Sequence, residues 1–194
     1  MRKSAALLGA LLIPGSARAH DAFGDLGAFY QSLLHPLADP AQGLLLAGLA
    51  IVLACQPREN VQWAYLALII ATLAASWLSM TIAFPELKLR WVGLGVAALG
   101  VLALSSGRVW LPVLLCVTVA IAVIASFAPG FASDPRTTVR AIWGSILGIL
   151  LVVLLVWGLL DSLQARLGRP PGLVAASWIV AIGIMAAALP EGVA

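Results

Sequence analysis

Charged residues are scarce in this chain, and that scarcity excludes most water-soluble architectures. Only 10% of the 194 residues are Asp, Glu, Lys or Arg, whereas 62% are hydrophobic; soluble domains are about 25% charged. The Lys and Arg residues are scattered singly over short connecting segments, so the net charge of +3 forms no basic patch. We therefore expect no nucleic-acid partner, and the lipid bilayer is the partner that this composition predicts.

Groups with catalytic or redox chemistry are also few. The chain has two histidines, His20 and His35, and two cysteines, Cys55 and Cys116, which both fall inside apolar runs. A thiol in such a run usually packs as a small apolar side chain, so a disulfide cannot be inferred from the sequence. An alternative interpretation is a metal site with soft sulfur ligands from Cys55, Cys116, Met80 and Met185. Such a site would suit monovalent copper better than nickel.

Uncharged apolar runs fill most of the sequence after residue 40. Each is about as long as the segment needed to cross a hydrocarbon layer roughly 30 Å thick, and a helix satisfies its backbone hydrogen bonds internally there. The sequence therefore predicts an all-α fold, a polytopic membrane helix bundle in one domain, 41–190. Short loops, among them 132–140 and 161–171, separate about six transmembrane helices at about 41–56, 61–84, 91–107, 109–131, 141–160 and 172–190.

None of these six runs contains Asp, Glu, Lys, Arg or His. Ionisable residues inside a membrane mark ion pathways and proton relays, so their absence argues against a pump or a proton-coupled transporter. It also leaves no pair of groups for acid–base or nucleophilic chemistry within the bilayer, and we expect no enzyme. An enzymatic alternative would need a metal centre at the start of the mature chain.

The first nineteen residues have the layout of a secretory signal peptide. A basic start, Arg2-Lys3, precedes a short apolar stretch, a Pro14-Gly15 break and an Ala-Arg-Ala sequence that ends at Ala19. Cleavage would expose His20 on the outer side of the cell inner (plasma) membrane, and an uncleaved anchor is the alternative. Lys and Arg divide equally between the loops of the two sides, so the predicted multi-pass orientation, with the mature N-terminus outside, rests on the signal peptide.

Residues 20–40 form the predicted exported amphipathic segment. Its apolar residues share one helix face, which predicts a short helix on the outer membrane surface or against the bundle. A mature His20 would offer an α-amine and an imidazole, a combination that chelates transition metals such as nickel or copper. The sequence predicts a metal site of His20, His35 and Asp39, with Asp21 and Asp25 as further donors. The alternative is that both histidines are ordinary surface residues.

The stretch AHDAFGDLGAF, from Ala19 to Phe29, followed by LHPL, from Leu34 to Leu37, resembles the opening of the HupE/UreJ family of membrane proteins. The resemblance covers about residues 1–50 and continues only as a pattern of six small spans. The resemblance implies uptake or delivery of a bound nickel or cobalt ion, and the soft side chains of this chain add copper as a further candidate. The family motif continues to an Asp-His pair, and the matching residues in this chain are Ala41 and Gln42, so two donors of the family are absent.

Small residues recur four positions apart in three runs: Gly43 with Ala47, Gly144 with Gly148, and Gly183 with Ala187. Such notches let helix backbones approach closely, either within one bundle or between a membrane protein and its partner or a second copy. The alternative function is therefore a non-transporting structural or accessory subunit of a larger membrane protein complex.

Overall fold

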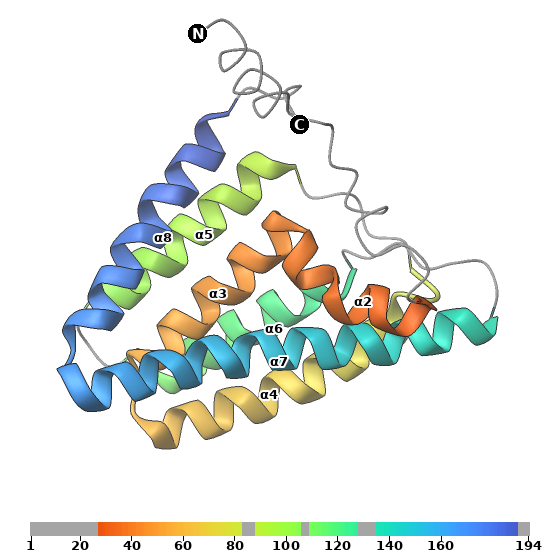
Figure 1. Cartoon of the computed structure of the whole chain (residues 1–194), viewed down its shortest axis with the longest axis horizontal. Helices are drawn as coiled ribbons and strands as arrows, with labels where there is room; N and C mark the ends of the chain where they lie inside the picture. Colours follow the sequence, from red (N-terminus) through yellow and green to blue (C-terminus); the bar gives the residue numbers. More distant parts are fainter. Residues whose placement is uncertain (1–26, 83–87, 106–108, 128–134, 190–194) are drawn as a thin grey trace, which may run out of the picture.

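A computed structural model describes residues 27–82, 88–105, 109–127 and 135–189, and these ranges contain helices and no strand (Figure 1). They hold seven helices: α2 (Gly27–Ala38), α3 (Pro40–Ala54), α4 (Arg58–Leu78), α5 (Leu89–Leu104), α6 (Leu111–Phe127), α7 (Pro135–Leu167) and α8 (Pro170–Ala188). The prediction of an all-α fold is confirmed for this part of the chain.

Helix ends follow local sequence signals. The side chain of Asp39 accepts a hydrogen bond from the Ala41 amide and so caps the start of α3, where Pro40 is the first helical residue. Gly168, in the left-handed region at φ 77°, ends α7, and Pro170 begins α8. Between α2 and α3 the chain bends by 70°.

Helix α3 is the centre of the bundle. Each of the other six described helices contacts it, while α5 lies along α8, α2 packs against α7 and α4 lies beside α6. Figure 1 shows the α5–α8 pair diverging from the α4–α7 layer, with α3 between them. Leu46, Leu49, Val52 and Leu53 of α3 are fully buried, so the core is formed around this one helix.

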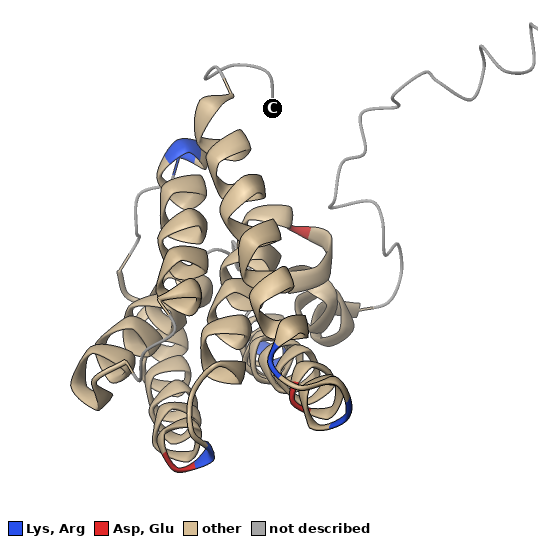
Figure 2. Cartoon of the chain, turned by 90° about the vertical axis from the view of Figure 1, so that its left-hand side faces the viewer, with Lys and Arg blue, Asp and Glu red and all other residues tan. Residues whose placement is uncertain are grey.

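The outward faces of the helices are apolar, and charge is confined to their ends. Figure 2 shows Lys, Arg, Asp and Glu near helix ends, with long uncharged stretches between them. Large apolar side chains such as Leu155, Trp178 and Met185 are about two-thirds exposed on α7 and α8. A water-soluble monomer rarely exposes apolar surface on this scale, whereas a lipid-facing surface requires it.

Three described helices are long and apolar enough to cross a membrane: α4, α8 and the Arg136–Leu167 part of α7. The bent α2–α3 pair makes a fourth if it is counted as one span. The apolar helices α5 and α6 have 16 and 17 residues, which is about 24 Å and about 26 Å of helix. The described helices thus include three or four candidate spans, a coarser result than the predicted six.

Helix α7 is longer than its apolar run. The expectation of loops at 132–140 and 161–171 is wrong for residues 135–140 and 161–167, which belong to the 33-residue helix Pro135–Leu167. The physical reason is that hydropathy reports the depth of the apolar layer, whereas a helix continues wherever its backbone bonds are satisfied. Arg136, Arg140, Asp161 and Arg166 therefore occupy helical turns beyond the apolar layer.

Glycines allow the closest helix contacts. A Cβ atom at Gly144 or Gly148 of α7 would collide with the carbonyl oxygen of Phe29 or Leu33 of α2. Likewise, a Cβ at Gly183 of α8 would lie 2.7 Å from the carbonyl oxygen of Gly93 of α5. The small-residue notches at Gly144 and Gly183 thus serve packing within the chain, the first of the two uses that their spacing indicates.

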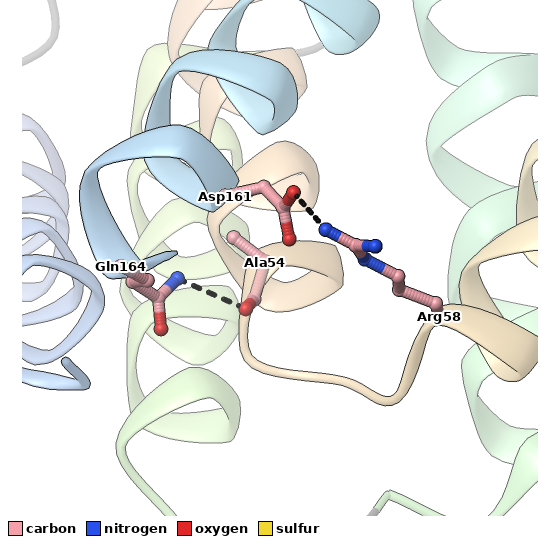
Figure 3. Close-up of polar contacts among 4 residues, drawn as sticks. All are labelled: Ala54, Arg58, Asp161 and Gln164. Atoms are coloured by element: carbon pink, nitrogen blue, oxygen red, sulfur yellow. Dashed lines mark hydrogen bonds and ion pairs between the residues drawn. The ribbon is translucent and has the colours of Figure 1, made fainter. Parts of the chain in front are cut away.

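Glutamine side chains join helix ends that are far apart in sequence. Gln164 of α7 donates a hydrogen bond of 3.0 Å to the Ala54 carbonyl at the end of α3, close to the Arg58–Asp161 ion pair (Figure 3). Gln56 accepts a hydrogen bond of 3.0 Å from the Val109 amide. Because helix ends leave backbone groups without intrahelical partners, an uncharged amide can satisfy them without placing a charge in the apolar layer.

Candidate functional site

His35 lies in the last turn of α2, next to the bend into α3, and is half-buried. Its Nδ1 atom is 2.9 Å from Oε1 of Gln42. The Nε2 group of Gln42 donates a hydrogen bond of 2.7 Å to the carbonyl oxygen of Ala125, near the end of α6. Gln42 is 2% exposed, so the chain from His35 through Gln42 to Ala125 is shielded on its inner side.

The direction of these bonds assigns the proton on His35. A carbonyl oxygen accepts and never donates, so the amide nitrogen of Gln42 faces Ala125 and its oxygen faces the imidazole. Nδ1 must then be the donor, and in the neutral ring the Nε2 atom carries the free lone pair. This is the arrangement of a metal-binding histidine, whose other ring nitrogen donates to a neighbouring acceptor.

Sequence reasoning missed the role of Gln42, although a signal was present. In a continuous helix the Ala125 carbonyl would accept from the amide of residue 129, which in this chain is proline and has no N–H. Gln42 supplies the missing donor. Gln42 thus connects the end of α6 to His35 and holds that histidine in place.

Asp39, predicted as a metal ligand, caps α3 in the structure. Its Oδ1 atom accepts the Ala41 amide hydrogen at 3.0 Å, and its own amide donates to the His35 carbonyl at 2.8 Å. The structure thus places His35 and Asp39 on the two sides of one bend. The Oδ2 atom of Asp39 takes no part in this cap and is left for a further ligand.

Two substitutions of Asp39 distinguish the hydrogen bond that caps α3 from the negative charge of the side chain. We expect Asp39→Ala to lower the free energy of unfolding by about 1 kcal/mol, because the cap is lost, and Asp39→Asn to leave it nearly unchanged, because an amide oxygen caps as well as a carboxylate. Thermal unfolding of both variants in detergent measures the difference. Equal stability of the alanine and asparagine variants would contradict the capping role.

The structure does not test the predicted donors that precede residue 27. His20, Asp21 and Asp25 lie outside the described residues, and within residues 27–82, 88–105, 109–127 and 135–189 no group of three or more His, Cys, Asp and Glu side chains could hold a metal. Cys116 is exposed on α6 and Met185 on α8, and these helices do not touch. The two cannot share a copper ion.

Comparisons with protein-family models, with curated proteins and with solved structures found no match to this chain. The fold nevertheless defines a class: the described residues form an all-helical bundle, with three or four helices apolar and long enough to span a membrane. This is the architecture of a membrane protein. Around His35, the one histidine in the described ranges, hydrogen bonds connect the imidazole through Gln42 to the Ala125 carbonyl.

Proposed function

We propose that the protein is a HupE/UreJ-like multi-pass membrane protein that takes up or delivers a transition metal ion, nickel or cobalt and alternatively copper. His35 is the oriented ligand, and His20 with its α-amine and the Oδ2 atom of Asp39 complete the site. The proposal includes the cleaved signal peptide, an outer mature N-terminus and six spans of the inner membrane, with α5 and α6 crossing as short helices.

The observation that carries the proposal is the partly buried hydrogen bond between His35 and the buried side chain of Gln42. It holds one tautomer and leaves Nε2 as the atom able to bind a metal. His35 and Asp39 lie on the two sides of one bend, and with His20 as the proposed third donor they would form an open site rather than a closed structural cage. An ion held in this way can leave for the next binding step, as uptake or delivery requires.

The test is elemental analysis of the purified full-length protein after exposure to nickel, cobalt and copper in turn. We expect one metal ion per chain, loss of that ion in His35→Ala, and a first residue of His20 in N-terminal sequencing. Asp39→Asn, which keeps the cap of α3, should weaken binding by less than His35→Ala does. Gln31→Ala, a change on an exposed side chain of the same helix, is the matched control.

Two outcomes would count against metal uptake or delivery. Wild-type protein without metal would exclude the site, and metal retained in His35→Ala would place it elsewhere. The accessory-subunit alternative then becomes the better explanation, and it predicts co-purification with another membrane protein at a constant ratio.

A further inference from the structure

A cavity of about 500 Å³ lies between α4 and α7, at the end of α3 opposite the His35 bend. On α4 its lining residues, from Arg58 through Gln62 to Leu66 and beyond, recur every three or four positions and so share one helix face. On α7 the lining residues are Leu154, Trp157 and Asp161. The volume falls in the range of small-molecule sites.

The two ends of the cavity differ in polarity. The Arg58–Asp161 ion pair and the exposed amide of Gln62 lie at one end, and the side chains of Leu66 and Leu154 lie at the other. Both leucines are more than 40% exposed, so the apolar end is open to the lipid-facing surface of the bundle. A ligand that matches this lining has a polar head and an apolar chain.

The Arg58–Asp161 ion pair determines which polar headgroup the ligand can have. Arg58 Nη2 is 2.9 Å from Asp161 Oδ2, and the side chains are 75% and 33% exposed. A guanidinium has five N–H donors and a carboxylate has two oxygens, so each group keeps hydrogen-bonding capacity beyond this one contact. Figure 3 shows one guanidinium nitrogen of Arg58 in contact with one carboxylate oxygen of Asp161, and the other nitrogens and the second oxygen outside this contact. A cation and an anion are therefore offered side by side.

We propose that this cavity binds one phospholipid with a zwitterionic ethanolamine headgroup, its phosphate on Arg58 and its ammonium on Asp161. One acyl chain follows the apolar end past Leu66 and Leu154, and the rest of the lipid stays in the bilayer. The ammonium donates hydrogen bonds that a choline cannot, and an anionic headgroup would face the Asp161 carboxylate. Trp157 suits this level of the membrane because indoles favour the headgroup region.

The test is native mass spectrometry of the purified full-length protein with equal amounts of phosphatidylethanolamine, phosphatidylcholine and phosphatidylglycerol that carry the same chains. We expect wild type to bind phosphatidylethanolamine about tenfold more tightly than either competitor, the value of one charge-assisted hydrogen bond. Asp161→Asn should shift the preference to phosphatidylglycerol, because Arg58 then has no acidic neighbour in the cavity. Leu154→Trp should reduce binding of all three lipids by filling the apolar end.

Glu59→Gln is the matched control. It removes one negative charge from the residue next to Arg58 without touching the cavity lining, so we expect the wild-type preference. An exposed ion pair contributes little to stability, and unchanged melting temperatures would show that Asp161→Asn is folded. Equal binding of the three lipids by wild type, or an unchanged preference in Asp161→Asn, would overturn the proposal. His35→Ala should leave lipid binding unchanged, so this test is independent of the metal proposal.

Discussion

Replacing Gly148 with alanine should lower the free energy of unfolding by about 2–3 kcal/mol, whereas the same change at Gly158, on the same helix, should raise it slightly. A Cβ at Gly148 would collide with the Leu33 carbonyl of α2, while a Cβ at Gly158 meets nothing within 4 Å. Backbone collisions in a packed contact typically cost about 1–3 kcal/mol. At an open helical site, alanine is favoured over glycine by about 0.5–1 kcal/mol.

Denaturation in mixed detergent micelles would measure both variants. A second pair on α5 provides an independent check, because a Cβ at Gly93 would lie 2.5 Å from the Ala187 amide nitrogen, whereas one at Gly95 would make an ordinary contact of 3.6 Å with Leu45. Gly93→Ala should destabilise and Gly95→Ala should not. If the four variants were equally stable, the close approaches of α2 to α7 and of α5 to α8 would be wrong.

The second large effect is expected at Gln42. Gln42→Leu keeps the volume of the side chain but leaves the Ala125 carbonyl and His35 Nδ1 without their partner, which should cost about 2–3 kcal/mol because both bonds involve a buried side chain. Gln62→Leu is the control, since Gln62 is exposed and lies at the edge of the lipid-facing surface. Unfolding measured as for the glycine variants gives the difference.

The same substitution should change the tautomer of His35. In a His20→Ala background, the single remaining histidine should give the ¹⁵N NMR signature of a ring protonated at Nδ1, and Gln42→Leu should abolish that preference. The measurement needs no metal, so it tests the orientation of His35 separately from metal binding. A ring protonated at Nε2 in the His20→Ala protein would contradict the proposed ligand atom.

Much of the fold was predictable because it depends on local properties of the chain. The predicted run at 141–160 lies within α7, and the runs at 61–84 and 172–190 overlap most of α4 and α8; these are the described helices that can cross a membrane. Hydropathy alone did not predict the ends of α7, because the helix extends beyond its apolar run in both directions, from Pro135 to the glycine at 168. The choice between packing within the chain and packing on a partner also required the positions of Phe29 and Leu33 opposite Gly144 and Gly148.

The candidate functional site was also predictable only in part from the sequence. The sequence alone showed that the apolar runs contain no charged residue or histidine, and it therefore directed attention to His35, which precedes them. This could be read locally because the cost of placing a charged group in lipid applies to each segment separately. The role of Gln42 depends on its distance from Ala125, 83 residues away in sequence, and the Arg58–Asp161 pair joins residues 103 apart. Contacts of this kind arise when helices pack, so they belong to the folded bundle and are absent from any local pattern of residues.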